Sequence, residues 1–246
     1  MKEIMKEFNL EGKTAVITGA SRGIVMAIAE KLSEYGSTTI LVSRKADSLE
    51  TVAKKIRKNG GKAHVLACHT GYPDRIKKMY DTILDTFGSL DILVNNAGIS
   101  GVIPSEQMTS AAWSQMMNTN LTGTFQCCRE IGKLMIEQQS GNIINFSSEN
   151  GQIGFSLGMT AESTTKIGIV GLSRSLAVEW GKHNIRVNAI LPGNMEEGMM
   201  EEMKDKESMF YRFAGENLLN LTPLSRFGTG DDIKGTIVFL ASEASG

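Results

Sequence analysis

The chain has 246 residues, of which 41% are hydrophobic, and this is enough to bury one sizeable core. Its formal net charge of −1 provides no global electrostatic field for nucleic acid or for an anionic membrane. No apolar run reaches the length of a membrane span, and the first residues lack the apolar core of a secretory signal.

The cysteines give a further indication of the compartment. The chain has three, Cys68, Cys127 and Cys128, without a CxxC spacing and odd in number. This fits buried thiols in a reducing compartment better than disulfides. We therefore expect a soluble cytoplasmic protein that binds neither nucleic acid nor membranes.

Short β-branched runs alternate along the chain with longer segments of helical periodicity. The predicted strands lie, in chain order, at Thr14–Thr18, Thr39–Val42, His64–Cys68, Asp91–Asn95, Asn142–Phe146 and Arg186–Ile190. The predicted helices between and after them lie at Ile24–Tyr35, Leu49–Ile56, Ile76–Phe87, about Ser110–Glu137, about Gly158–Gly181 and Asp231–Ala241. Pro73 stands near the first turn of the third helix and Gly88 just past its end, as is typical of helix boundaries.

This alternation predicts a parallel sheet covered by helices on both faces, with right-handed crossovers. No repeat, low-complexity segment or Pro/Gly-rich linker divides the chain, so we expect one domain over residues 1–246. The segment of about residues 194–222 is rich in methionine and charge and follows a strand end. We interpret it as a helical lid; an ordinary amphipathic helix pair packed on the sheet is the alternative.

The stretch VITGASRGIV, Val16–Val25, joins the first strand to the first helix. Gly19 and Gly23 let the backbone turn tightly and approach a ligand closely. The helix N-terminus then offers free N–H groups and partial positive charge to a pyrophosphate, and Ser21 and Arg22 add donors. A turn that follows a strand, opens a helix and begins a βαβ unit indicates a dinucleotide site.

Three motifs in consistent order, TGASRGI, NNAG at Asn95–Gly98 and RVNAILPG at Arg186–Gly193, resemble the short-chain dehydrogenase/reductase family. The resemblance extends from about Leu10 to the C-terminus. It implies an α/β, Rossmann-like, doubly wound parallel sheet with helices on both faces. It also implies a nicotinamide dinucleotide and hydride transfer to or from a small-molecule carbonyl or secondary alcohol.

The resemblance further implies the residues that hold the cofactor. Gly19 to Ile24 would line the pyrophosphate, His69 and Thr70 the adenine, and Met195 the nicotinamide carboxamide. A loop histidine with local partners is the alternative for His69. The full implied set is Gly19, Ser21, Arg22, Gly23, Ile24, Arg44, His69, Thr70, Asn96, Gly98, Lys166, Pro192, Gly193 and Met195.

The charge at the end of the second strand indicates which cofactor is used. An acidic residue there would bind the ribose 2′-hydroxyl of NAD, but the chain has Ser43-Arg44, with Arg22 in the turn. Guanidinium groups pair well with phosphate, so NADP(H) is favoured over NAD(H) unless Arg44 is only a solvated surface residue. Val25 stands where the family has glycine, and its β-branched side chain is expected to push the helix outward or narrow the pyrophosphate site.

Four positions carry catalysis in the resembled family. Asn120, Ser148 (or Ser147) and Lys166 match the family's asparagine, serine and lysine; capping of local backbone is the alternative for the serines. Glu162 occupies the position of the family's tyrosine, four residues before Lys166. The segment between Ser148 and Glu162 is one residue longer than the usual pattern.

A glutamate changes the chemistry at that position. Its ordinary pKa is about 4.3 against about 10 for tyrosine, and a carboxylate accepts hydrogen bonds but has no proton to donate. Glu162 would act as a base toward an alcohol, or as an acid if burial raised its pKa. The alternative is an ion pair with Lys166 on the helix surface.

Further expectations concern metals and assembly. His64, His69 and His183 are scattered and no acidic cluster has ligand spacing, so no metal site is expected. The family's last strand has no counterpart before Gly246, so either the given sequence stops short of that strand or the sheet lacks its final edge strand. By resemblance the helical segments around Ser110–Glu137 and Gly158–Gly181 pair between subunits, which favours a homodimer or homotetramer.

Three functions follow from these residues. The first is an NADP(H)-dependent oxidoreductase with Glu162 as an unusual acid/base. The second is a catalytically impaired dinucleotide-binding or interaction protein on the same fold, favoured by Val25, Glu162 and the absent strand. The third, weaker one is a non-redox reaction in which Glu162 abstracts a proton next to a carbonyl.

Overall fold

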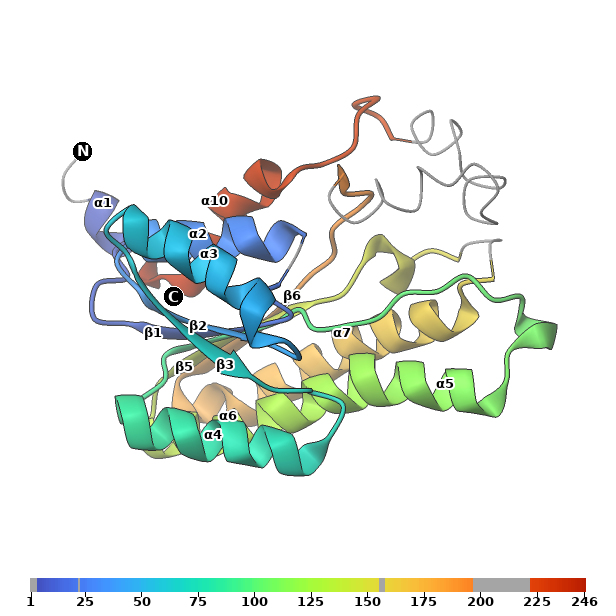
Figure 1. Cartoon of the computed structure of the whole chain (residues 1–246), viewed down its shortest axis with the longest axis horizontal. Coiled ribbons are helices and arrows are strands. Elements are labelled where there is room, and N and C mark those ends of the chain that lie inside the picture. The colour runs from blue at the N-terminus through green and yellow to red at the C-terminus, as the bar shows by residue number, and fades with distance from the viewer. Residues whose placement is uncertain (1–3, 22, 155–157, 197–221) are drawn as a thin grey trace.

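The computed structural model describes residues 4–21, 23–154, 158–196 and 222–246. In these residues six parallel strands form one sheet in the order β3-β2-β1-β4-β5-β6 (Figure 1). Their bounds are β1 Thr14–Thr18, β2 Thr38–Ser43, β3 Lys62–Ala67, β4 Ile92–Asn95, β5 Gly141–Phe146 and β6 Ile185–Ile190. All six predicted strands are confirmed, and the strand order reverses between β1 and β4.

Helices cover both faces of the sheet, so the predicted doubly wound α/β fold is confirmed (Figure 1). The α-helices are α1 Ile4–Glu7, α2 Ile24–Glu34, α3 Ala46–Lys58, α4 Pro73–Phe87, α5 Ser110–Met116, α6 Gly123–Gln138, α7 Thr160–Trp180 and α10 Gly230–Ala241. Short 3-10 turns η1, η3, η4 and η5 span Ser105–Gln107, Glu149–Gly151, Gly181–His183 and Glu243–Ser245, and a π-helix, η2, spans Met117–Thr122.

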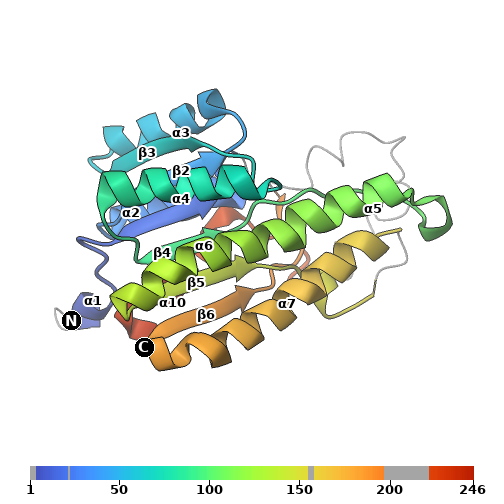
Figure 2. The ribbon, with the colours of Figure 1, turned by 90° about the horizontal axis from the view of Figure 1, so that it is seen from below.

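Each face of the sheet has its own apolar core. Helices α2, α3 and α10 lie on one face, where Ile28, Leu49 and Ile237 pack together with β-strand residues. Helices α4, α6 and α7 lie on the other, where Ile76 and Trp180 are buried (Figure 2). Strands covered on both faces read as continuous apolar runs, which is why short β-branched stretches located them correctly.

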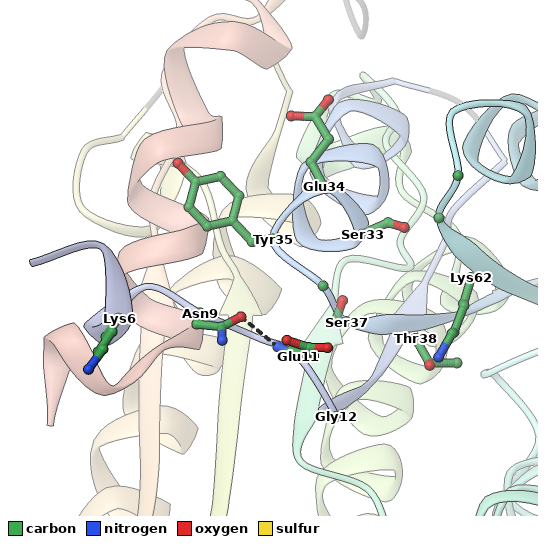
Figure 3. Close-up of a pocket in the computed structure, with 13 residues that line it drawn as sticks. Lys6, Asn9, Glu11, Gly12, Ser33, Glu34, Tyr35, Ser37, Thr38 and Lys62 are labelled. Carbon is green, nitrogen blue, oxygen red and sulfur yellow. Dashed lines mark hydrogen bonds between the residues drawn. The ribbon is translucent and has the colours of Figure 1, made fainter. Parts of the chain in front are cut away.

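The amino-terminal edge of the sheet carries an open cavity of about 780 Å³ (Figure 3). It is lined by the end of α2, the starts of β2 and β3 and the residues before β1, including Ser33, Tyr35, Thr38 and Lys62. This is the edge opposite the one where the strand ends, and hence the sequence motifs, lie. The cavity therefore has no part in the dinucleotide site predicted from the sequence.

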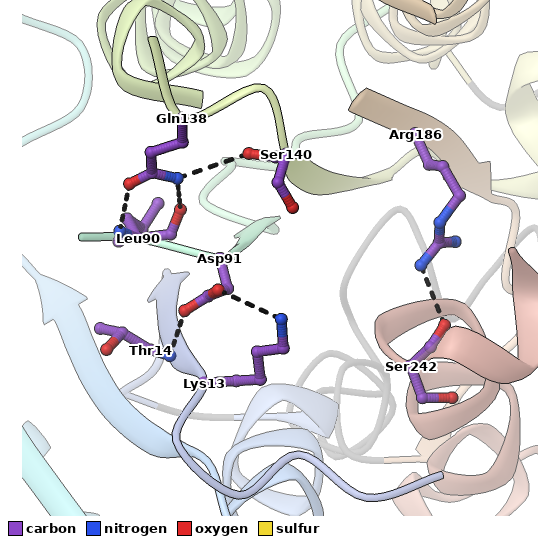
Figure 4. A network of polar contacts seen from close by, with 8 residues as sticks. All are labelled: Lys13, Thr14, Leu90, Asp91, Gln138, Ser140, Arg186 and Ser242. Atoms are coloured by element: carbon purple, nitrogen blue, oxygen red, sulfur yellow. Dashed lines mark hydrogen bonds and ion pairs between the residues drawn. The ribbon is translucent and has the colours of Figure 1, made fainter. Parts of the chain in front are cut away.

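Polar contacts close the remainder of this edge (Figure 4). Asp91 accepts from the backbone N–H of Thr14 at 2.8 Å and from the Lys13 ammonium at 3.4 Å. The Gln138 amide bonds both the N–H and the C=O of Leu90, at 3.1 and 3.0 Å. Arg186 donates to the carbonyl of Ser242 at 3.0 Å, which ties the chain after α10 to β6. These bonds satisfy backbone groups that the strand ladders leave free.

Two sequence expectations need correction or fall outside the structure. The helix expected over Ser110–Glu137 is not continuous, because the π-helix η2 separates α5 from α6. Most of the predicted lid, residues 197–221, lies outside the described residues. In the described part of the chain the sheet ends at β6, and no helix there is long and apolar enough to cross a membrane.

Candidate active site

The turn after β1 has the shape of a phosphate cradle. Gly19 has φ +73°, and a Cβ there would lie 2.9 Å from the Cα of Ala97, so only glycine fits without movement. At Gly23, φ is +76° and a Cβ would meet nothing within 4 Å. Helix α2 begins next to this open space with no side-chain cap and no acidic residue in its first turn. Uncapped N–H groups and positive dipole suit an anion, so the residues present fit a pyrophosphate.

The neighbouring strand end is held against this turn by Thr18. Its hydroxyl accepts from the N–H groups of Asn96 and Ala97, at 3.1 and 3.2 Å. This places the side chain of Asn96 beside Gly19, with its Nδ2 3.2 Å from the Cβ position there. The two glycine motifs, far apart in the sequence, therefore meet at the point where strand order reverses, which is where doubly wound sheets bind ligands.

Two other turn residues can be described only in part. Arg22 lies outside the described residues, and Ser21 is half-buried in the turn. Val25 is 1% exposed and packs in the core beneath α2, beside Ile28 and Ala29. Its side chain thus points into the apolar core, and the turn between β1 and α2 keeps open space at Gly23.

The ends of β2 and β3 bring cations together. Arg44 and Arg75 are exposed, and the pKa of His69 is lowered by burial first and then by these two guanidinium groups. The Arg75 guanidinium stacks 5.4 Å from the ring centre of Tyr72, a side chain that is 55% exposed. His69 Nδ1 accepts from the N–H of Gly71 at 3.1 Å, and Thr70 is buried beside it. The result is a positively charged, aromatic rim.

The π-helix η2 places Asn120 in the site. Asn120 is 1% exposed; its Oδ1 accepts from the N–H of Ile99, and its Nδ2 donates to the carbonyl of Ile99, both at 2.8 Å. Its Nδ2 also lies 3.3 Å from the hydroxyl of Thr165 on α7. Because Gly98 has no Cβ, the amide of Asn120 fits against it, 3.3 Å from the Cβ position. A π-segment adds a residue to one turn, and such segments are common at functional sites.

Consecutive serines after β5 have different partners. The Ser147 hydroxyl is buried and donates to the carbonyl of Lys166 at 2.8 Å, which pins α7 to the strand end. The Ser148 hydroxyl accepts from the N–H of Asn150 at 3.3 Å and is half-buried. Ser148 therefore has the freer hydroxyl of the two, and local capping accounts for part of its bonding.

Glu162 lies in the first turn of α7 and is 8% exposed. Its Oε2 accepts from the Ser100 hydroxyl at 2.6 Å. The loop that carries Ser100 is bonded to the start of α7 at two further places, by the Ile103 N–H to the carbonyl of Gly158 and by Ser105 to Thr160. A carboxylate is stabilised at a helix N-terminus. The expectation of a simple surface ion pair with Lys166 is wrong, because Glu162 is buried.

Lys166 lies one turn further along α7, and its ammonium donates to the carbonyl of Phe146 at 3.3 Å. Burial lowers the pKa of Lys166, while the negative charge of Glu162 opposes that change. Glu162 and Lys166 thus form a partly desolvated pair of charges beside the carbonyl of Phe146 at the end of β5. A desolvated pair of this kind is suited to proton transfer.

The turn after β6 packs against the residues that follow β5. The N–H of Glu149 donates to the carbonyl of Pro192 at 3.0 Å, and the Glu149 carboxylate lies 3.2 Å from the Cβ position of Gly193. Met195 pairs as a parallel bridge with Gly228 and packs toward the α2 core, so its side chain is shared between core and turn.

The structure therefore brings together most of the residues expected from the sequence. Asn120, Ser148, Glu162 and Lys166 surround the ends of β4 and β5, and Gly19, Gly23, Ile24, Asn96 and Gly98 surround the reversal of strand order. Arg44 follows β2 and His69 and Thr70 follow β3, where the carbonyl of Thr70 approaches Gly123 at the start of α6. In the described residues no group of three or more His, Cys, Asp or Glu side chains could hold a metal ion.

Four residues near these positions were not anticipated from the sequence. They are Ser100, the partner of Glu162; Thr165, the partner of Asn120; Arg75; and Glu149. Only Glu149 carried a signal, as an acidic residue directly after Ser148 at a strand end. The other three depend on which loops and helices meet.

Comparison with known proteins agrees with this geometry. The sequence model of the short chain dehydrogenase family matches residues 13–208. The chain is 36% identical to a 3-oxoacyl-acyl-carrier-protein reductase FabG of Aquifex aeolicus, covering 96% of this chain and 93% of that protein. It is 34% identical to D-threitol dehydrogenase of Mycolicibacterium smegmatis, covering 97% and 89%. A gluconate 5-dehydrogenase of Burkholderia cenocepacia, solved with NADP and tartrate, superposes with a TM-score of 0.90 at 28% identity, covering 98% and 92%.

Proposed function

Because this chain belongs to the short-chain dehydrogenase family of oxidoreductases, we propose that it is an NADP(H)-dependent enzyme that interconverts a secondary alcohol and a carbonyl of a small molecule, with Glu162 as its acid/base. The observation that carries the proposal is the buried Glu162 carboxylate, one helical turn from the desolvated Lys166. Lys166 is bonded to Phe146 and Ser147 at the end of β5, directly before Ser148, at the edge where doubly wound sheets bind ligands.

The bound dinucleotide would supply hydride transfer, and the chain's own residues the proton chemistry. Glu162 would remove the hydroxyl proton of an alcohol, since a carboxylate accepts and does not donate. Ser148 would orient the reacting oxygen, and Lys166 would stabilise the negative charge of Glu162. Ser100 would hold the carboxylate in place through its 2.6 Å bond. We therefore propose alcohol oxidation as the favoured direction.

The preference for NADP(H) over NAD(H) is supported by the charges beyond β2 and β3. Arg44 and Arg75 both lie close enough to His69 to lower its pKa. Asn96 and Gly19 lie beside each other where the strand order reverses. Guanidinium groups bind phosphate through paired, charge-assisted hydrogen bonds. The related gluconate 5-dehydrogenase was solved with NADP. Within the proposal Arg22 would add a further guanidinium.

The substrate class follows the proposed direction. Relatives of this chain are named for a 3-oxoacyl thioester, for D-threitol and for gluconate. A carboxylate base suits the hydroxylated compounds among these. We propose a polyol or hydroxy acid as the first class to screen, with a 3-oxoacyl thioester as the comparison.

The experiment compares Glu162→Gln with Glu179→Gln, a matched control at an exposed position of the same helix. General acid–base catalysis contributes about 10²- to 10⁴-fold, so Glu162→Gln should lose about that much turnover while Glu179→Gln keeps it. The rate of the parent protein should follow one ionisation that disappears in Glu162→Gln. An unchanged pH–rate profile in this variant would remove Glu162 from the mechanism.

A second candidate function is dinucleotide binding without turnover. The observation that favours it is the Ser100 hydrogen bond, which engages the carboxylate that the reaction needs. It predicts binding of NADPH with no oxidation or reduction across the screen. Appearance of turnover in a Glu162→Tyr variant alone would then show that the acid is the missing component.

The same proposal covers domain organisation, assembly and location. We propose a single domain over residues 1–246 and a homodimer or homotetramer formed through α6 and α7; most of the lid expected at about residues 194–222 lies outside the described residues. Exposed apolar side chains on these helices, Phe125, Ile167 and the 86% exposed Val178, support such pairing. Val178→Glu should shift sedimentation toward the monomer if the pairing forms. The three free, buried cysteines support a cytoplasmic location.

A further inference from the structure

Among the described residues, the Glu149 carboxylate lacks the compensating partners that two other acidic side chains have. Glu149 is half-buried, whereas the buried Glu130 is held by Arg129 and Lys133 at 2.6 Å each and the buried Glu162 is held by Ser100. Within the described part of the chain, no group donates a hydrogen bond or forms an ion pair with the Glu149 side chain. Burial alone raises the pKa of Glu149, and no neighbouring cation offsets it.

The backbone fixes where this carboxylate lies. Glu149 begins the η3 turn directly after Ser148, and its N–H is bonded to the carbonyl of Pro192 at 3.0 Å. Its Oε2 is 3.2 Å from the Cβ position of Gly193, so glycine leaves room for it. The turn η3 packs on α7, which carries Lys166 and Glu162. The backbone of Glu149 is therefore fixed between the ends of β5 and β6, and its carboxylate lies beside Gly193.

The strand order indicates which half of a bound dinucleotide would lie beside Glu149. In a sheet of order 3-2-1-4-5-6, the two nucleotide halves lie on either side of the β1/β4 reversal. The pyrophosphate fits at the start of α2, and the cation-rich rim of Arg44 and Arg75 lies beyond β2 and β3. The nicotinamide half of a bound dinucleotide would consequently lie over the ends of β4, β5 and β6, the side that carries Glu149.

A nicotinamide ring differs in charge between its two forms, being cationic when oxidised and neutral when reduced. We propose that Glu149 senses this charge and holds the oxidised dinucleotide more tightly than the reduced one. The inference rests on the proposed function, because it requires the dinucleotide at this edge. It assigns to Glu149 a role in selecting cofactor state, separate from the proton transfer at Glu162.

The test measures binding and not turnover. Affinities of the purified protein for NADP⁺ and NADPH are measured by calorimetry, for the parent chain, for Glu149→Gln and for the control Glu179→Gln. Glu149→Gln keeps the size of the side chain and removes the charge. A charge interaction across a partly hydrated cleft predicts that the ratio of NADP⁺ to NADPH affinity falls by roughly three- to tenfold in Glu149→Gln. The ratio should be unchanged in Glu179→Gln.

The outcomes separate this inference from the proposed function. Binding of both forms with an unchanged ratio in Glu149→Gln overturns the role of Glu149 and leaves the proposed function standing. An equal loss of affinity for NADP⁺ and NADPH also overturns the role of Glu149, because such a loss would come from a change in the shape of the site and not from the lost charge. Failure of the parent chain to bind either form overturns both proposals. A ratio that falls chiefly through weaker NADP⁺ binding supports the inference.

Discussion

The two halves of the carboxyl edge differ in the sign and in the burial of their charges. The β1–β3 half carries exposed cations, Arg44 and Arg75, around His69. The β4–β6 half carries two carboxylates, the half-buried Glu149 and the buried Glu162, and Glu162 lies one helical turn from the desolvated Lys166. Exposed charges act at long range and are screened by salt, whereas buried ones act on close neighbours and shift pKa values. The first half is therefore suited to binding a phosphate and the second to moving a proton.

The largest expected loss of stability comes from a substitution in the β4–β6 half. Asn120→Ala removes a buried amide that bonds both backbone groups of Ile99, and unsatisfied buried groups cost about 1–3 kcal/mol each, so the free energy of unfolding should fall by roughly 2–4 kcal/mol. Urea unfolding at constant slope measures this. Asn118→Ala, at an exposed position of the same π-helix, is the control and should change it by less than about 0.5 kcal/mol.

The next largest expected loss of stability comes from a substitution at the reversal of strand order, where the two halves meet. Gly19→Ala places a Cβ 2.9 Å from Ala97 at φ +73°, and left-handed backbone alone costs about 1–2 kcal/mol in a residue with a side chain. Gly23→Ala likewise places a side chain at positive φ, +76°, but has open space around its Cβ. Thermal unfolding should therefore rank Gly19→Ala below Gly23→Ala. Equal melting temperatures would contradict the close approach to Ala97.

A smaller effect tests the β1–β3 half alone. Arg44→Ala should weaken NADPH binding by about tenfold, which corresponds to ~1.4 kcal/mol, and leave NADH binding unchanged. The dependence of NADPH affinity on salt concentration should decrease as well, because an exposed cation has been removed. Arg174→Ala, an exposed arginine on α7, serves as the control. Parallel loss of NADPH and NADH affinity would show that Arg44 does not contact the 2′-phosphate.

The smallest effect concerns stability and pH in the β4–β6 half. The folded-state pKa of Glu149 is raised by burial, so its ionised form destabilises the folded protein as pH rises through that value. Glu149→Gln should therefore stabilise the protein at pH 7–8, by less than about 1 kcal/mol because the side chain is partly hydrated. The gain should vanish below about pH 4, where both states of the parent chain are protonated. Melting curves across this range measure it, and a gain that grows in acid would contradict the sign.

Sequence periodicity located the helices and strands because the residues of most of them follow local patterns of hydrophobicity and helix capping. The six strands are covered on both faces and so appear as apolar runs, and Gly88 closes α4 in left-handed conformation as its position indicated. The π-helix was missed because its apolar spacing resembles that of an α-helix over so few residues. What distinguishes it is the bond between Asn120 and Ile99, a contact across 21 residues of chain.

The sequence by itself determined the family, the alternation of strands and helices, and the residues that follow each strand, because glycine turns and buried strands are local and periodic. Only the tertiary structure decided that Val25 faces the core, that Ser147 bonds to α7 while Ser148 faces the turn η3, and that Glu162 meets Ser100. It also decided that Glu149 has no ion-pair partner among the residues that the structure describes. Burial and partnership of a charge depend on which distant segments pack around it, and no local pattern encodes that.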